Sequence, residues 1–164
     1  MKQISILLLL FWLSACNQQT GNTQTLQNRV DSLESELANT YKPGFGEFMS
    51  SIQIHHDKLW FAGKNENWEL ADFEINEIKE SLTGIKEYCG DRTETKDIGM
   101  INPGIDSVSN AIQQKKSSQF RSSYELLTTT CNSCHQATHH EFNVIKIPDT
   151  PPFSNQVFSA SNKK

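Results

Sequence analysis

The chain has 164 residues, 15 of them Lys or Arg and 19 Asp or Glu, with a formal net charge of −4 at pH 7. This mild acidity and the lack of a basic cluster exclude a nucleic-acid-binding protein, because neutralising phosphates requires clustered Lys and Arg. The length is sufficient for one domain with a hydrophobic core.

The first fifteen residues have the parts of a secretory signal. Lys2 precedes the apolar run ISILLLLFWL, and small residues follow this run before a polar stretch begins. The run is too short to span a bilayer, which takes roughly 20 apolar residues. We therefore predict a signal peptide at residues 1–15. Its removal leaves 14 basic against 19 acidic residues, a formal charge of −5.

The end of this segment, Leu13-Ser14-Ala15-Cys16, resembles the lipobox of bacterial lipoproteins. In that family the cysteine is lipidated and becomes the first residue of the mature chain. The resemblance implies lipidation of Cys16 and a location in the bacterial cell envelope, facing the periplasm. The membrane contact would be an anchor rather than a span. An ordinary secretory signal, with its cysteine there by chance, is the alternative.

Residues 16–42 are interpreted as the anchor and a linker with a short coiled-coil-like helix. The apolar residues of this segment are spaced by four, three and four positions, as a and d positions are: Leu26, Val30, Leu33 and Leu37. Only about two heptads are present, so a helical or disordered spacer is favoured, with weak homo-oligomerisation through residues 25–40. Lys42-Pro43-Gly44 marks its end.

Residues 43–140 carry helical periodicity throughout, in four segments with an apolar face each. Expected helices run from about Phe45 to Gly63, over 68–88, around 105–112, and from Ser117, the expected N-cap, into a cysteine-rich motif. No strand alternation occurs before residue 141. Four amphipathic helices with mostly short loops predict an all-α fold, an antiparallel four-helix bundle.

The motif CNSCH, Cys131 to His135, is improbable by chance in a chain with 4 cysteines and 5 histidines. Two thiols three residues apart can each add to one vinyl group of a haem, and the adjacent histidine then lies under the iron. This spacing predicts one covalently bound haem c. Covalent attachment suits an exported protein, from which a loosely held haem could be lost.

Three other chemistries are compatible with parts of this motif. A disulfide between Cys131 and Cys134 suits an oxidising compartment but leaves His135 unexplained. A thioredoxin-like site would follow a strand, and none precedes this motif. Zinc could be bound by the two cysteines and two of His135, His139 and His140, but structural zinc sites usually join distant pieces of chain. Haem is the favoured interpretation.

A helical bundle with CNSCH near the end of its fourth helix resembles the class II c-type cytochromes, the cytochrome c-prime family. The resemblance covers roughly residues 44–140 and rests on helix order and motif placement. It implies that Cys131 and Cys134 carry the haem thioethers and that His135 is the proximal iron ligand. The family often has a basic residue four places after the motif, where this chain has His139.

The chain also continues beyond the point where that family tends to end. Residues 141–164 include apolar side chains at Phe142, Val144, Ile145 and Ile147, and prolines that forbid a helix at 148, 151 and 152. We predict an extended C-terminal arm that packs back on the bundle. It would cover either a haem edge or an outer groove between helices.

The residue on the other side of the iron is expected on the first helix. In an antiparallel bundle Met49 lies about as far from the start of this helix as His135 lies from the end of the fourth. His56 is seven residues further, about 10.5 Å along the axis. The class II family also places its distal residue early in the first helix. We therefore predict Met49 as the distal ligand or a distal shield.

Other residues are weaker candidates for that position. Ile52, one turn further, would leave an open iron face, and Met100 lies in an inter-helix loop. His55 and His56 are expected to be polar partners or surface groups. Cys89, the remaining thiol, is expected to be buried at the end of the second helix, with intermolecular pairing as the alternative.

His/Met ligation suits one-electron transfer to and from redox partner proteins, which is the predicted function. The alternatives are a five-coordinate haem protein that binds NO or CO, and a lipoprotein interaction module with a structural haem. We identify no catalytic constellation and expect no enzymatic activity. The acidic residues Glu74, Glu77 and Glu80 are interpreted as a solvated helix face.

Overall fold

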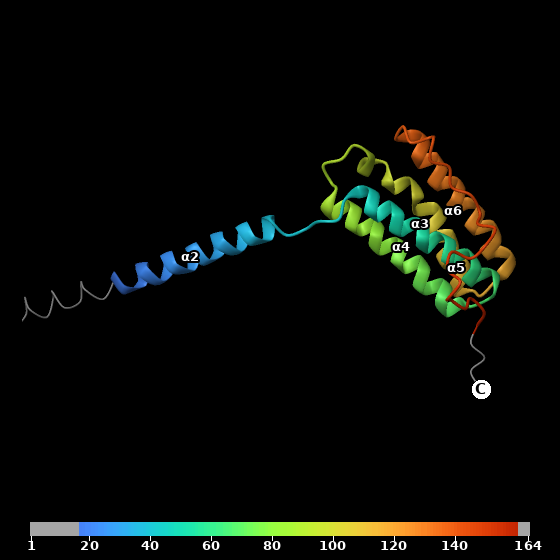
Figure 1. The fold of residues 1–164 in the computed structure, drawn as a ribbon, viewed down its shortest axis with the longest axis horizontal. Helices are drawn as coiled ribbons and strands as arrows, with labels where there is room; N and C mark the ends of the chain where they lie inside the picture. The colour runs from blue at the N-terminus through green and yellow to red at the C-terminus, as the bar shows by residue number, and fades with distance from the viewer. Residues whose placement is uncertain (1–16, 161–164) are drawn as a thin grey trace, which may run out of the picture. The chain divides into compact units, whose positions relative to one another are not determined.

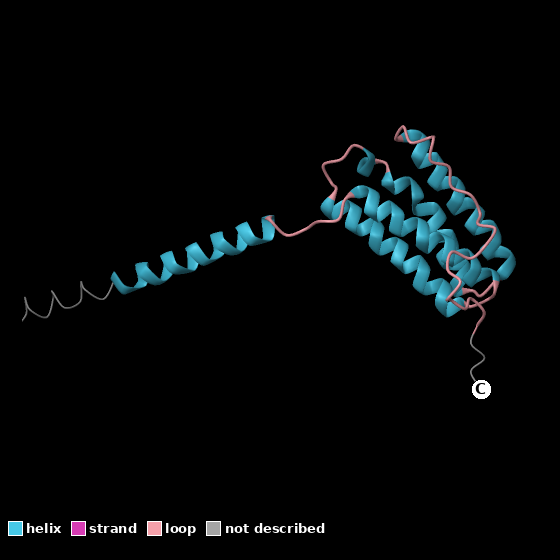
Figure 2. Cartoon of the chain, in the orientation of Figure 1, coloured by secondary structure: helices cyan, strands magenta, loops and turns pink. Residues whose placement is uncertain are grey.

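The computed structural model describes residues 17–160, with side chains from residue 22 onward. It consists of two compact units, which divide between Lys42 and Pro43. The predicted signal peptide, Cys16 and the last four residues of the arm lie outside the described residues. All regular structure in the described part is helical, with five α-helices and two short 3-10 helices and no strand (Figure 2). The all-α prediction is confirmed for this part of the chain.

The first unit contributes one helix, α2, from Asn17 to Ala38. Hydrogen bonds between side chains one turn apart, Gln24 to Asn28 and Gln27 to Asp31, support it on its surface. The apolar stripe predicted from the sequence is exposed along its length: Leu26, Val30, Leu33 and Leu37.

The second unit contains the other helices (Figure 1). They are α3 (Phe45–Lys64), α4 (Trp68–Tyr88), the 3-10 helices η1 (Glu94–Lys96) and η2 (Ile98–Ile101), α5 (Asn102–Gln113) and α6 (Ser117–Ala137). The four long helices contact one another in a cycle: α3 with α4, α4 with α5, α5 with α6, and α6 with α3. The largest fully buried side chains lie between them, among them Leu59, Ile75, Ile78, Val108, Phe120 and Tyr124.

Two tight turns connect the helices of this unit without glycine. Glu66, between α3 and α4, and Lys115, between α5 and α6, have φ values of 57° and 53°. Asn67 then begins α4 by accepting a hydrogen bond from the Leu70 amide, 3.3 Å away. These left-handed residues allow short connections that place consecutive helices side by side.

The predicted end of the first helix is correct to within one residue, and the predicted N-cap of the last helix is wrong. α3 ends at Lys64, and Gly63 lies inside its last turn, where a Cβ atom would come within 2.1 Å of the Phe120 ring. Ser117 does not cap α6, because Lys116 is the N-cap residue and the Ser117 hydroxyl donates to the Glu66 carboxylate instead. In both cases a contact with another helix decides the role of the residue.

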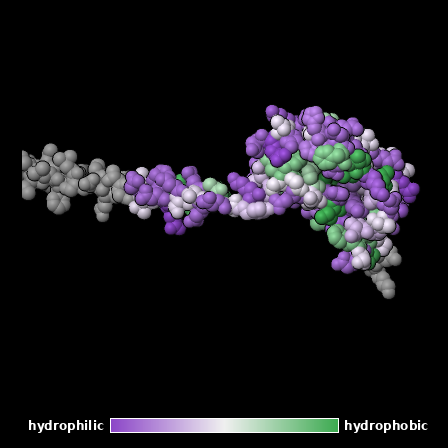
Figure 3. All heavy atoms as spheres, turned by 45° about the horizontal axis from the view of Figure 1, so that its top comes forward, coloured by the Kyte–Doolittle hydropathy of each residue, from purple (hydrophilic) through white to green (hydrophobic). Residues whose placement is uncertain are grey.

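The C-terminal arm, residues 141–160, has neither helix nor strand and returns along α6 (Figure 2). Phe158 is buried against Phe61, with ring centroids 5.7 Å apart, and the Asn67 amide donates to the Ser159 carbonyl. Other apolar side chains of the arm remain on the surface, Phe142 at 81% and Val144 at 71% exposure. The face of the molecule seen in Figure 3 shows apolar patches among hydrophilic side chains.

Candidate functional site

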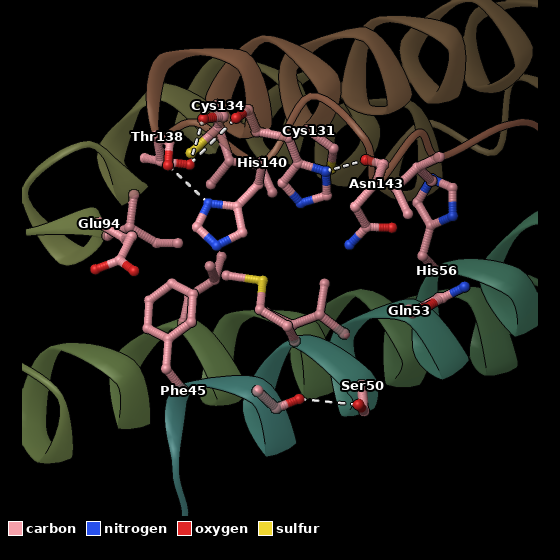
Figure 4. A pocket seen from close by; sticks show the side chains of 18 of the residues that line it. Phe45, Ser50, Gln53, His56, Glu94, Cys131, Cys134, Thr138, His140 and Asn143 are labelled. Atoms are coloured by element: carbon pink, nitrogen blue, oxygen red, sulfur yellow. Dashed lines mark hydrogen bonds between the residues drawn. The ribbon is translucent and has the colours of Figure 1, made fainter. Parts of the chain in front are cut away.

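A cavity of about 340 Å³ lies between the first turns of α3 and the last turns of α6. Its volume is within the range of small-molecule sites, roughly 300–1,000 Å³. Figure 4 shows Cys131 and Cys134 on α6 on one side of it and Phe45 and Ser50 on α3 on the other. The loop with η1 and η2 and the start of the arm complete its lining.

The four residues predicted to meet a haem all line this one cavity. Cys131, Cys134 and His135 come from α6, and Met49 comes from α3. Met100, the weak alternative, is 39% exposed and is not part of the lining. Cys16, the predicted lipidation site, lies outside the described residues.

The two motif cysteines are present as separate thiols. Burial raises the pKa of Cys131 to about 12, with the neighbouring Cys134 adding to the shift. Burial also raises the pKa of Cys134, and its thiol is directed at the Asp97 carbonyl, 3.7 Å away. Both groups are therefore neutral thiols at pH 7. This disfavours a thioredoxin-like pair, since reactive cysteines of that kind have a lowered pKa.

His135 has a defined tautomer. Its Nδ1 atom is 2.6 Å from the backbone carbonyl oxygen of Asn143 in the arm. A carbonyl only accepts hydrogen bonds, so the proton must be on Nδ1 and the lone pair on Nε2. Histidines that bind metals through one ring nitrogen almost always donate the other N–H to a carbonyl, a carboxylate or water. His135 is thus prepared to coordinate through Nε2.

The α3 side of the cavity carries three apolar side chains beside the polar residues Ser50, Gln53 and His56. Phe45, Met49 and Ile52 lie one helical turn apart along this side, and all three belong to or pack against the hydrophobic core. Leu82 of α4 and Ile98 of η2 extend the apolar surface. The only soft, potentially coordinating atom contributed by these five residues is the Met49 sulfur.

His56 also lines this cavity and is buried. Its Nδ1 is 2.9 Å from the Tyr124 hydroxyl, and its Nε2 is 3.1 Å from the Thr128 hydroxyl. These two hydroxyls also reach backbone carbonyls, those of His56 and Tyr124. Four contacts would need four protons, two from the hydroxyls and two from the ring.

Burial lowers the pKa of His56 to about 4, so the ring is neutral at pH 7 and holds one proton. The four contacts then share three protons, and one hydroxyl must turn from its carbonyl to the ring. Both ring nitrogens are occupied by these partners. The sequence-based expectation of a polar partner rather than an iron ligand agrees with this environment.

His55 points away from the cavity to a different cluster. Its Nδ1 is 2.6 Å from Oε2 of Glu74 and its Nε2 is 3.8 Å from Oε2 of Glu77. Lys58 Nζ approaches the other Glu74 oxygen at 3.7 Å. Glu74 has no exposed surface, so its interpretation as part of a solvated face is wrong. The reason is that α3 covers this part of α4 and supplies two basic partners.

His140 is a cavity residue that sequence reasoning assigned only to the zinc alternative. Its Nδ1 is 2.7 Å from the Thr138 carbonyl oxygen, and Figure 4 shows its ring directed from α6 towards Phe45. The preceding residue, His139, is exposed and has a φ of 60°. The left-handed residue turns the chain so that the next histidine reaches the cavity.

Arg92 and Glu94, on the loop before α5, also line the cavity and had no sequence signal. Their side chains form an ion pair with 2.6 Å between Nη2 and Oε1, which lowers the pKa of Glu94 to about 2. The Arg92 guanidinium lies 5.3 Å from the centre of the Phe45 ring. The loop therefore places a cation at the cavity lining.

Within residues 17–160, no three His, Cys, Asp or Glu side chains are grouped as a metal-binding cluster. No helix of that part of the chain is both long enough and apolar enough to cross a membrane. Comparison with known protein families, with curated proteins and with solved structures gives no match.

Proposed function

We propose that the protein is a membrane-anchored c-type cytochrome that carries one covalent haem c and transfers single electrons in the periplasm. In this proposal α3 to α6 form an antiparallel four-helix bundle of the class II type. The contacts of α3 with α6 support this arrangement: residues near the start of α3 share a cavity with the end of α6, and Gly63 near its end meets Phe120 near the start of α6.

The hydrogen bond from His135 Nδ1 to the Asn143 carbonyl is the observation that carries the proposal. It leaves Nε2 unprotonated on a residue directly after two cysteines that line the same cavity. The donor set fits haem c: two thiols for the vinyl groups, one imidazole for the iron and an apolar opposite side. Cys131 and Cys134 would hold the thioethers, and His135 would be the proximal ligand.

When bound, the haem supplies a one-electron couple whose potential depends on its axial ligands, burial and hydrogen bonds. The chain's own contribution is to hold the imidazole and to exclude water with Phe45, Ile52 and Leu82. Met49 from α3 is the proposed sixth ligand, and a thioether in that position raises the potential.

The apolar lining around Met49 also supports a second candidate function. If the Met49 sulfur only shields the iron, no other α3 residue of the lining offers a ligand, because both ring nitrogens of His56 are engaged. If His140, whose Nδ1 faces the Thr138 carbonyl, also stays uncoordinated, the iron would be five-coordinate and suited to binding NO or CO.

The remaining parts of the chain are assigned roles in the same proposal. Cys16 would be lipidated and would hold the protein at a membrane of the bacterial envelope, with α2 as spacer. The anchor raises the local concentration near redox partner proteins.

The exposed stripe of α2 would allow weak self-association through residues 25–40. If Val30 and Leu37 occupy heptad position 'a', then Arg29 occupies position 'g' and Glu34 position 'e'. In a pair of parallel helices, the residue at 'g' of one helix faces the residue at 'e' of the other. Two chains anchored in one membrane have parallel helices.

The test is expression of the full chain in bacteria with the c-type maturation machinery, followed by optical and EPR spectra with and without CO. We expect covalent haem that survives denaturation and a low-spin ferric spectrum. Met49→Ala should turn it high-spin and permit rapid CO binding, whereas Ile52→Ala, on the same side of the cavity, should leave the spin state unchanged. Absence of covalent haem would refute the cytochrome proposal, and a high-spin unmutated protein would favour gas binding.

A further inference from the structure

Asn132, the first residue between the two motif cysteines, makes a two-point contact with the C-terminal arm. Its Nδ2 donates to the carbonyl oxygen of Ile145 at 2.8 Å, and its Oδ1 accepts from the amide of Ile145, also at 2.8 Å. An Asn side chain carries the donor and the acceptor that a neighbouring β-strand would offer. The contact joins residues 13 positions apart in sequence.

We propose that Asn132 is a positioning residue: by fastening Ile145 it holds the Asn143 carbonyl against His135 and so fixes the tautomer and orientation of the proximal imidazole. The effect of Asn132 on the iron rests on the proposed function. Its effect on the tautomer of His135 does not, because that tautomer exists in the chain without haem.

The course of the arm links the position of Ile145 to that of the Asn143 carbonyl. Asn143 and Ile145 both line the cavity, and their backbone carbonyls both accept hydrogen bonds from side chains of α6, those of His135 and Asn132. The Asn143 carbonyl oxygen lies 2.6 Å from His135 Nδ1, and only Val144 separates Asn143 from Ile145. Fixing Ile145 therefore restricts the position of the Asn143 carbonyl.

Few other contacts of the described arm hold this stretch. The Asn143 amide donates to the His140 carbonyl at 2.9 Å, which closes a local turn. Ile147, two residues beyond Ile145, packs against the hydrophobic core. The contacts further along involve Phe153 with Lys58, Phe158 with Phe61, and Ser159 with Asn67, all at least eight residues beyond Ile145. Without Asn132, the stretch that carries the Asn143 carbonyl would be held by its own turn and by the packing of Ile147.

The expected consequence at the iron has a definite sign. Donation from Nδ1–H to a carbonyl makes the ligating nitrogen more basic, and a more basic ligand stabilises ferric iron over ferrous iron. Loss of the contact should shift the ferric–ferrous equilibrium about tenfold towards ferrous iron, a rise in potential of about 59 mV for one electron.

The first test uses the full chain without haem and compares Asn132→Ala with Ser133→Ala. Ser133 is the matched control, because it is the other variable residue of the motif and its hydroxyl donates only within α6, to the Thr129 carbonyl. We expect ¹⁵N NMR to find His135 as the Nδ1–H tautomer in the unmutated chain and in Ser133→Ala. Asn132→Ala should give a tautomer mixture and at least tenfold faster hydrogen exchange at the Ile145 amide.

A single Nδ1–H tautomer in Asn132→Ala would overturn the proposal. If that variant does not fold, Ile145→Pro replaces it, because proline removes the amide that Asn132 accepts from and leaves the helices unchanged. Asn132→Asp is a conservative variant that keeps the acceptor and loses the donor, and it should fall between Asn132→Ala and the unmutated chain.

The second test measures the reduction potential of the haem-loaded protein. Asn132→Ala should raise it and Ser133→Ala should not. Equal potentials in Asn132→Ala and the unmutated protein would show that the arm does not act on the iron. If no haem binds at all, the proposed function fails, while the NMR result still decides whether Asn132 positions His135.

Discussion

The two ends of the contact between α3 and α6 are built in opposite ways. At one end, rings from both helices and from α4 fill the space: Trp60 and Tyr124 have centroids 5.0 Å apart, and Trp68 meets Phe120 edge to face at 6.1 Å. Gly63 leaves room for the Phe120 ring. At the other end the same two helices enclose a cavity lined by cysteine, histidine and methionine.

The difference lies in what α3 carries along the face turned to α6. Near its end it has the Trp60 ring and Gly63, whose missing side chain leaves room for the Phe120 ring. Near its start it has Gly46 and Ser50, which are small and leave space, and Met49 beside them. His56 lies between the two ends, in contact with Tyr124 on the filled side and lining the cavity on the other. One end therefore provides stability, and the other is free to hold a ligand.

The largest effect is expected from substitutions that remove the cysteines of the cavity and leave the aromatic end unchanged. Cys131→Ser combined with Cys134→Ser should abolish covalent haem completely, because no thiol of the cavity lining remains to form a thioether. The helical content by circular dichroism should stay unchanged, since the aromatic end is intact. Cys89→Ser is the control: Cys89 is buried at the end of α4 and does not line the cavity, so covalent haem should persist.

A substitution in the aromatic cluster of the filled end should lower the stability of the domain. Phe120 is fully buried, so Phe120→Ala should lower the free energy of unfolding by about 3–5 kcal/mol through lost burial and a residual cavity. Urea denaturation of the haem-free chain measures it. Phe73→Ala, at a side chain that is 52% exposed, should change little. Equal losses for both would mean that the aromatic cluster does not stabilise the domain.

His56, which lies between the two ends, should make the free energy of unfolding depend on pH. The pKa of His56 is about 4 in the folded chain and 6.5 when unfolded. As pH falls below about 6.5, the unfolded chain takes up a proton that the folded chain refuses, so stability is lost between about pH 6.5 and 4. The full loss is about 3 kcal/mol at 1.36 kcal/mol per pKa unit. His56→Gln should remove this part of the pH profile in urea titrations, and an unchanged profile would contradict the assignment.

The smallest effects are expected from the same substitution, Gly→Ala, made at each end of α3. Gly63→Ala puts a methyl group within 2.1 Å of Phe120 and should cost about 1–3 kcal/mol. Gly46→Ala meets no atom within 4 Å in the haem-free chain and should stabilise the helix by about 0.4–1 kcal/mol. The two shifts in denaturation midpoint should have opposite signs. Shifts of the same sign would show that the ends do not differ in packing.

The sequence by itself determined the helices, because apolar side chains at three- and four-residue spacing must be buried on one face. The segment predicted over 68–88 coincides with α4, and the buried state expected for Cys89 is confirmed. It also indicated which residues would share a site, since Met49 and CNSCH lie at corresponding distances from their helix ends. Both inferences use spacing along one helix, which is a local property.

Only the tertiary structure decided the roles that depend on a second segment of chain. Glu74 carries the same carboxylate as Glu77 and Glu80, and it is buried because His55 and Lys58 approach it from α3. Asn132 and Asn143 have no periodicity that would mark them, and their roles arise where the arm returns to α6. Hydrogen bonds between distant residues depend on where the chain folds back, and no local pattern in either segment records that.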